Sequence, residues 1–158
     1  MKGKFQSYTW LAVIAWVVVI ADRVTKIVVE HRYGVGYGPK PILDSVLFLT
    51  VLRNSGAAFG LFKNFTAGFL VISLLVMAAI LVYYPRIPAH DWPARIGLAM
   101  VFGGAVSNAY DRGLQGSVID FIQVPHWPVF NVADSSITVG VALLVVGSFF
   151  RRRTASVP

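Results

Sequence analysis

Residues 118–134 read Val-Ile-Asp-Phe-Ile-Gln-Val-Pro-His-Trp-Pro-Val-Phe-Asn-Val-Ala-Asp and lead into the last apolar segment of the chain. They place two carboxylates, Asp120 and Asp134, among apolar neighbours in a chain that has only seven acidic residues. A carboxylate close to hydrocarbon usually costs a few kcal/mol, so it indicates a functional site by default. Two of them near one membrane face predict a pair that shares a proton and activates water.

The composition predicts a membrane protein. Of the 158 residues 56% are hydrophobic, and the mean hydropathy of +0.68 is too high for an ordinary soluble domain. A helical span needs roughly 20 residues, and four apolar stretches suit this role, at residues 8–29, 67–84, 96–110 and 132–150. The first has no small-x-small cleavage site, so we expect an uncleaved span rather than a signal peptide. We therefore expect one all-α integral membrane domain over residues 1–158, with four transmembrane helices.

The long segment between the first two spans, residues 30–66, predicts a small β-containing region outside the membrane. Glycines and prolines at residues 34–41 end the first helix, and residues 42–52 have a composition typical of strands. We expect a short strand pair or an interfacial element there. Residues 111–130 are expected to form a loop, in which Asp120 has a strand-like, apolar context.

The basic residues favour a membrane orientation over nucleic-acid binding. The net charge is +7, but the lysines and arginines lie at chain ends and loops rather than along one stripe. With four spans, one side carries Lys2, Lys4, Arg86, Arg95 and the arginines at 151–153. This side is expected to be cytoplasmic, which puts both termini in the cytoplasm and the two aspartates near the outer face.

Several other chemistries lack the residues that they need. The chain has no cysteine, which excludes disulfides, thiolate nucleophiles and cysteine-based zinc sites. It has no His-Glu-x-x-His motif for zinc and no Gly-x-Ser-x-Gly elbow, and its three histidines are scattered. A serine–lysine arrangement stays open on paper, with Lys26 and one of Ser107, Ser135 or Ser136.

Several polar residues near the ends of the spans allow either a structural or a functional interpretation. Asp22 and Lys26 are four residues apart and can pair on one helical face, as a solvated helix end or as a clamp beside a site. Asn108 and Arg112 need a hydrogen-bond network close to lipid, and Arg112 can hold a carboxylate or a phosphate head group. Asp134 can alternatively serve as a helix N-cap.

Five short motifs occur in order along nearly the whole chain: Asp22-Arg-x-Thr-Lys26, Asn54-x-Gly-Ala-Ala-Phe59, Gly103-Gly-Ala-x-x-Asn108-x-x-Asp-Arg112, Val118-x-Asp-Phe-Ile122 and Phe130-Asn-x-Ala-Asp134. Together they resemble the bacterial lipoprotein signal peptidases, or type II signal peptidases. The resemblance implies an aspartic endopeptidase of the bacterial cytoplasmic (inner) membrane, with its catalytic pair near the outer surface. Its substrates would be prolipoproteins whose cysteine carries diacylglycerol, cut just before that cysteine.

The resemblance implies a role for each matching position. Asp120 and Asp134 become the catalytic pair. The residues implied to bind substrate or support the site are Asn54, Asn108, Arg112 and Asn131, and those implied to be structural nearby are Asp22 and Lys26. No metal and no cofactor is implied; the expected partners are diacylglyceryl-prolipoproteins and membrane lipids, without nucleic acid, and we expect a monomer. Ser107 departs from the family's usual glycine, which affects the expected packing of the third span.

Two other classes of membrane protein are the alternatives. A small proton-coupled four-span transporter would also need carboxylates in the membrane. Its key carboxylate should lie near mid-membrane, and such proteins often contain repeats, whereas both aspartates here lie near one face and no repeat is visible. A purely structural membrane protein would leave the clustered amides and carboxylates without a role.

Overall fold

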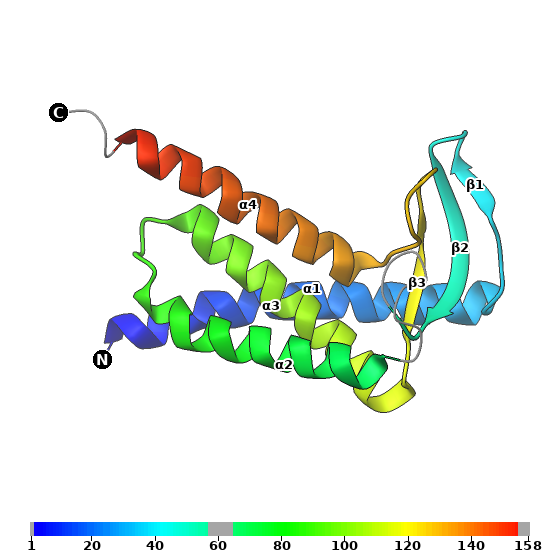
Figure 1. Ribbon diagram of the computed structural model, residues 1–158, viewed down its shortest axis with the longest axis horizontal. Coiled ribbons are helices and arrows are strands. Elements are labelled where there is room, and N and C mark those ends of the chain that lie inside the picture. The colour runs from blue at the N-terminus through cyan, green and yellow to red at the C-terminus, as the bar shows by residue number, and fades with distance from the viewer. Residues whose placement is uncertain (1, 57–64, 155–158) are drawn as a thin grey trace.

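The structure is a computed structural model that describes residues 2–56 and 65–154, and the side chains of residues 8–56 and 65–148. Within these residues, four long helices carry a small sheet at one end (Figure 1). The helices are α1 (Lys2–Tyr33), α2 (Thr66–Tyr83), α3 (Trp92–Gln115) and α4 (Val132–Thr154), with a 3-10 turn, η2 (Tyr84–Arg86), after α2. The strands are β1 (Lys40–Leu43), β2 (Leu47–Asn54) and β3 (Val118–Gln123). Phe59, and with it residues 57–64 of the expected segment 30–66, lie outside the described residues.

The expected architecture of helices with a small β region is confirmed. The three strands form an antiparallel sheet in the order β1-β2-β3. Its first two strands are the hairpin expected within residues 30–66, and the third comes from the segment that we expected to be a loop. Val51, Ile119 and Phe121 of the sheet form a buried apolar cluster against which Val29 of α1 packs, so the sheet is fixed to that helix.

Helix α3 is the centre of the bundle, and small residues let its neighbours approach. A Cβ on Gly104 would lie 2.5 Å from the Ala133 carbonyl oxygen of α4, and one on Gly103 would lie 2.9 Å from Ala15 Cα of α1. Gly140 of α4 meets Gly97 in the same way, 2.5 Å from its carbonyl oxygen. The close contact between backbones that small residues predicted for the third span is therefore present.

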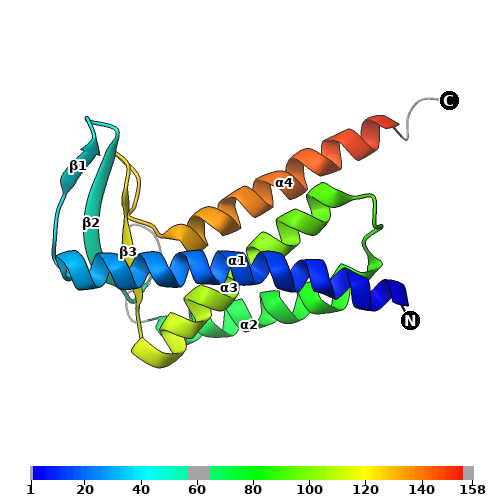
Figure 2. The ribbon, with the colours of Figure 1, turned by 180° about the vertical axis from the view of Figure 1, so that it is seen from behind.

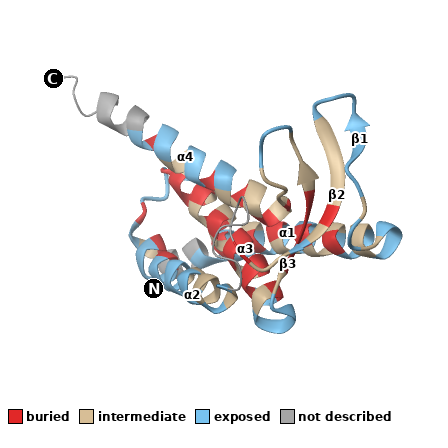
Figure 3. Cartoon of the chain, turned by 45° about the vertical axis from the view of Figure 1, so that its right-hand side comes forward, coloured by how far each residue is buried: buried red, intermediate tan, exposed pale blue. Residues whose placement is uncertain are grey.

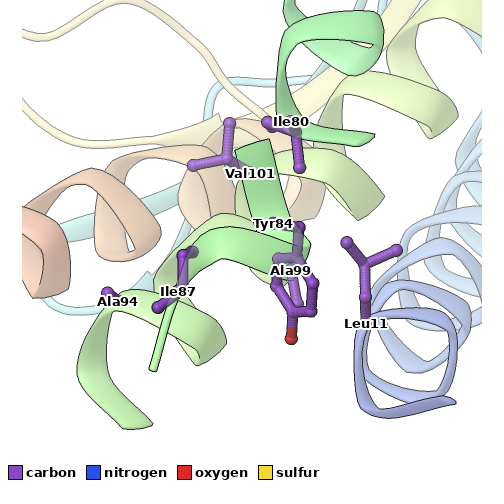
Figure 4. Packing of buried hydrophobic residues seen from close by; sticks show 7 residues of the cluster. All are labelled: Leu11, Ile80, Tyr84, Ile87, Ala94, Ala99 and Val101. Carbon is purple, nitrogen blue, oxygen red and sulfur yellow. The ribbon is translucent and has the colours of Figure 1, made fainter. Parts of the chain in front are cut away.

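An apolar cluster holds the helices together at the end opposite the sheet. It contains Leu11, Ile80, Tyr84, Ile87, Ala94, Ala99 and Val101, drawn from α1, α2, α3 and the turn between α2 and α3 (Figure 4). The Tyr84 ring is completely buried and stacks on Tyr8 of α1, with 6.4 Å between the ring centroids. The chain reversal after α2 is thus packed against α1 as well as α3.

The helix boundaries differ from the expected spans in two places that matter for the site. Helix α1 continues to Tyr33, so Asp22 and Lys26 lie inside the helix and do not close it. Helix α3 continues to Gln115, so Arg112 is helical and is not part of a loop over residues 111–130. That helix ends at Gly116, which has a left-handed backbone with φ of 68° and donates its N–H to the Arg112 carbonyl, a common way to end a helix.

Many of the exposed side chains on the helices are large and apolar, as lipid-facing helices require. Figure 3 shows where the exposed and buried residues of each helix lie. Among the described residues one helical stretch, Thr66–Arg86, is long and apolar enough to cross a membrane by length and composition, with a mean hydropathy of 2.4. The apolar part of α4, Val132–Ser148, is shorter. Helices α1 and α3 carry charged residues in their middle or final turns, which lowers their hydropathy.

The contact between α3 and α4 gives a prediction in which two glycines of one helix behave oppositely. Gly104→Ala should lower the free energy of unfolding by roughly 1–3 kcal/mol, because the new methyl overlaps the α4 backbone. Gly113→Ala is the matched control: its Cβ meets nothing within 4 Å, and alanine is the better helix former by about 1 kcal/mol. Thermal unfolding in detergent measures both, and equal effects would contradict the tight contact.

Candidate active site

Asp120 lies on β3 and is almost completely buried, with 2% of its surface exposed. The register of β2 and β3 puts Leu52 opposite it, so Asn54 is its diagonal neighbour on the same face of the sheet. Asn54 Nδ2 donates to Asp120 Oδ2 at 2.9 Å. The Gly56 N–H donates to Asn54 Oδ1 at 2.9 Å, which fixes the orientation of the amide. Strand pairing thus supplies Asp120 with a positioned donor.

Asp134 lies in the first turn of α4 and is held there by Asn131, the residue that precedes the helix. Asn131 Oδ1 accepts the Asp134 N–H at 2.9 Å, and Asp134 Oδ2 accepts the Asn131 N–H at 3.3 Å. This reciprocal pair is a capping box. The N-cap role considered for Asp134 therefore belongs to Asn131, and the second oxygen of Asp134 remains directed into the site.

Two amide side chains connect the carboxylates. Asn131 Nδ2 donates to Asp120 Oδ1 at 2.7 Å and approaches Asn108 Oδ1 at 3.3 Å. Asn108, on α3, donates its Nδ2 to Asp134 Oδ1 at 2.8 Å. Because amides are uncharged donors, they hold both carboxylates in place without a full positive charge. The pair can therefore keep or lose a proton within a fixed geometry.

A buried ion cluster lies next to Asn108. Lys26 Nζ lies 2.6 Å from Asp22 Oδ2 and 2.7 Å from Asp111 Oδ2, and it donates to Asn108 Oδ1 at 3.1 Å. Arg23 forms a further ion pair with Asp111, so two cations face two carboxylates. Asp22 and Lys26 are 0% and 2% exposed. This excludes a solvated helix end: the pair is a buried clamp between α1 and α3, in contact with Asn108.

Asp22 ties three helices together. From α1 its Oδ1 accepts the Ala133 N–H at the start of α4 at 2.9 Å, and its Oδ2 accepts the Ser107 hydroxyl of α3 at 2.6 Å. The Ala133 N–H is one of the first donors of α4, which have no partner within their own helix. Ser107 therefore adds a buried hydrogen bond to the clamp.

The serine–lysine alternative has no geometric support. All three acceptors around the Lys26 ammonium are carboxylate or amide oxygens. Ser107 donates to Asp22, while Ser135 and Ser136 donate to the backbone carbonyls of residues 131 and 100. Among the described side chains, none of these serines hydrogen-bonds Lys26. A serine nucleophile would need such a contact with its base.

Arg112 lies one helical turn after Asn108, and its positive charge acts on both Asp120 and Asp134. Its guanidinium carbon lies 5.3 Å from the centre of the Phe69 ring on α2. Its Nε is buried, and within the described residues it has no hydrogen-bond partner. An unpaired buried donor is costly, so this group is suited to an acceptor that a bound molecule supplies.

The pKa of the Asp120 carboxyl is raised to about 7, first by burial and second by the nearby charge of Asp134. Hydrogen bonds from Asn54 and Asn131, and then the charge of Lys26, lower the pKa and limit the rise. A carboxyl with a pKa near neutrality can hold or release a proton under ordinary conditions. Two carboxylates in one network, one of them tuned in this way, form an arrangement suited to proton exchange with water.

The structure brings together the eight residues to which the resemblance gave a role, from α1, β2, α3, β3 and the start of α4: Asp22, Lys26, Asn54, Asn108, Arg112, Asp120, Asn131 and Asp134. Two further residues, Asp111 and Arg23, belong to the ion cluster and were missed as site residues. Each had a signal in the sequence: Asp111 follows Asn108 by three residues on the same helix, and Arg23 adjoins Asp22. Across residues 2–56 and 65–154, no group of three or more acidic or histidine side chains has a geometry that could hold a metal ion.

Comparisons with known proteins agree with one another. A family model described as Signal peptidase (SPase) II matches residues 14–150. The lipoprotein signal peptidase of Geobacillus kaustophilus is 41% identical over 148 residues, which cover 91% of this chain and 94% of that protein. That of Geobacter metallireducens is 37% identical, over 89% of this chain and 90% of that one. A bacterial membrane enzyme solved by the in meso method at 2.3 Å resolution has a TM-score of 0.84 at 29% identity, over 93% of this chain and 91% of its own.

The ion cluster predicts an unequal cost for removing two cations. Lys26→Met should lower the free energy of unfolding by roughly 3–5 kcal/mol, because it leaves Asp22 and Asp111 with less compensation in a buried place. Arg53→Met removes the exposed ion pair with Glu30 and should cost only about 0–1 kcal/mol. Denaturant unfolding in detergent micelles compares the two variants. A Lys26→Met protein as stable as Arg53→Met would show that the clamp is not needed for the fold.

Proposed function

The chain belongs to the signal peptidase II family, a family of membrane peptidases that remove signal peptides from prolipoproteins, and we propose that it does so as an aspartic endopeptidase. Asp120 and Asp134 are the proposed catalytic pair. The observation that carries the proposal is the single hydrogen-bond network that joins both carboxylates through Asn108 and Asn131. The raised pKa of Asp120 supports it, because one member of such a pair must keep a proton.

In the proposed mechanism, one carboxylate is ionised and takes a proton from a water molecule. The water oxygen forms a bond to the scissile carbonyl carbon while the other, protonated carboxyl donates its proton to the carbonyl oxygen. The tetrahedral intermediate then collapses: the carboxylate that is now ionised takes a proton from one of the intermediate's hydroxyls as the carbonyl re-forms, the carbon–nitrogen bond breaks, and the other carboxyl gives its proton to the leaving nitrogen, so the pair again holds one proton. Asp120 and Asp134 exchange roles during turnover, so neither is permanently the acid or the base.

The surrounding residues position this pair and its substrate. Asn54, Asn108 and Asn131 donate to the carboxylates and hold their orientation. Arg112 acts beside them, and its Nε, which has no hydrogen-bond partner among the described residues, is suited to an acceptor on the substrate peptide or its lipid. Asp22 and Lys26 support the site indirectly: Lys26 donates a hydrogen bond to Asn108, and Asp22 accepts one from the backbone at the start of α4.

The proposed substrate is a prolipoprotein whose cysteine already carries diacylglycerol, and the bond cut is the one just before that cysteine. The enzyme is proposed to be a monomer of the bacterial cytoplasmic (inner) membrane and to form one domain over residues 1–158. All four helices are proposed to span the membrane, with both termini in the cytoplasm and the catalytic pair near the outer face of the membrane. The position of both aspartates at the sheet end of the bundle supports this, and a proton transporter would instead need a carboxylate near mid-membrane.

The proposed pair is tested by removing one proton-exchanging group at a time. Asp120→Asn and Asp134→Asn keep the shape of the side chain, and each should abolish cleavage of a synthetic diacylated prolipopeptide by purified protein in detergent. The double variant should be hardly worse than either single variant, because groups that act as a unit are strongly non-additive. Peptide cleavage is followed by mass spectrometry.

Two kinds of control, a carboxylate variant outside the site and two serine variants, make this result specific. Asp44→Asn removes an exposed carboxylate from the hairpin turn and should leave activity unchanged. Ser107→Ala and Ser135→Ala should both retain cleavage, since the serine hydroxyls have no catalytic part. Near-parental cleavage by the Asp134→Asn protein, with loss in a serine variant, would overturn the aspartic mechanism.

The pH profile gives a separate test. Because the pKa of Asp120 is raised to about 7, the carboxyl loses its proton as the pH rises through that value, and the rate should fall on the alkaline side. The Asn54 hydrogen bond lowers this pKa, so Asn54→Ala should raise it further and move the alkaline limb to higher pH. Gln115→Ala removes an exposed amide elsewhere and should leave the limb in place. A shift of the limb to lower pH in Asn54→Ala would contradict the assignment.

A further inference from the structure

The sheet and the connection that follows it carry a group of large apolar side chains that are more than half exposed. Ile42, Leu43 and Val46 lie in and next to the turn between β1 and β2, with 61%, 58% and 58% of their surface exposed. Trp127, in the connection between β3 and α4, is 63% exposed. We call these four residues the outer tip. Large apolar side chains gathered at one exposed end of a sheet usually indicate an interaction surface.

The pairing of the strands brings the outer tip together. Phe48, at the start of β2, pairs with Gln123, at the end of β3. The turn before β2 and the connection after β3 therefore leave the sheet at the same end. The ribbon shows both reaching in the same direction, beside one another (Figure 1). Trp127 thus belongs to the same end of the molecule as the hairpin turn.

The position of the sheet places this tip beside the apolar bundle. The strands run across the direction of the helices, at the end of the bundle where α4 begins, and the hairpin extends on the side of α4 (Figures 1 and 2). Exposed apolar residues on α4, such as Val139 and Val141, show that the surface of this helix suits lipid. Helix α1 runs past β3 and β2 and ends about level with β1, so the end of α1 and the sheet lie at the same end of the molecule (Figure 1).

We propose that the outer tip inserts into the interfacial region of the membrane leaflet that surrounds the start of α4. Its three aliphatic side chains would enter the boundary with the acyl chains, and Trp127 has the amphipathic ring that membrane interfaces favour. Lys40, exposed on β1, can reach phosphate groups with its ammonium. The same sheet carries Asn54 and Asp120, so the insertion would fix the depth of the candidate site relative to the lipid surface.

The proposal is tested on the full-length protein with nitroxide labels. Since the chain has no cysteine, Ile42→Cys, Val46→Cys and Trp127→Cys can be labelled singly without a background. In liposomes of phosphatidylcholine and phosphatidylglycerol, each label should collide more with oxygen, which concentrates in lipid, than with a water-soluble nickel complex. His31→Cys, at an exposed position in the last turn of α1 and outside the outer tip, is the matched control and should show the reverse order.

A second arm tests whether the tip acts as one unit. Ile42→Ser with Val46→Ser should increase the nickel accessibility of the label at position 127, because these exposed side chains contribute to insertion and not to the core. Tip labels that are as accessible to nickel as the His31→Cys label would overturn the proposal. Labels shielded from both reagents would also overturn it, because they would show that protein, such as a second copy of this chain, covers the tip. Neither readout depends on cleavage activity, so a failure of the proposed mechanism would leave this test intact.

Discussion

The Lys26 ammonium lies between the carboxylates of Asp22 and Asp111, and the arrangement of α1, α3 and α4 at the site depends on this contact. Burying one such charge alone would be prohibitive, so every member of the cluster needs its partners in place. The backbone N–H of Ala133 completes the set by donating to Asp22. The cluster therefore fixes the start of α4, and with it the position of Asp134, through a direct contact from α1.

The candidate site separates the buried ion pairs from the two carboxylates that we propose exchange a proton. The ion pairs of Lys26 are made with Asp22 and Asp111 and not with the proposed catalytic pair. The carboxylates of Asp120 and Asp134 instead receive hydrogen bonds from uncharged amides. A lysine in direct contact would strongly favour the ionised form of either carboxylate. Amide donors favour it less, so burial can hold the pKa of Asp120 near neutrality. Asn108 lies on the boundary, because it contacts both Lys26 and Asp134.

The sheet and the helices fix the positions of Asp120 and Asp134 in different ways. β3 presents Asp120 at a position set by its register with β2, and that pairing also brings Asn54 to the same face. The capping box of α4 presents Asp134 at a position set by the helix start. Asn131 belongs to both, because its backbone and Oδ1 cap the helix while its Nδ2 reaches Asp120. The Asn131 side chain thus connects β3 to the start of α4.

The sequence by itself determined the local features of this protein: the apolar helices, the hairpin within residues 30–66 and the prominence of Asp120 and Asp134. These follow from composition and from neighbours a few residues apart, which is where periodicity and turn chemistry act. Only the tertiary structure decided that Asp22 and Lys26 are buried within α1, that Arg23 and Asp111 join them, and that residues 118–123 form the third strand. The physical reason is that these features depend on partners far away in the chain. The Lys26–Asp111 contact, for example, joins residues 85 positions apart, and no pattern within a single helix reveals which charges will meet.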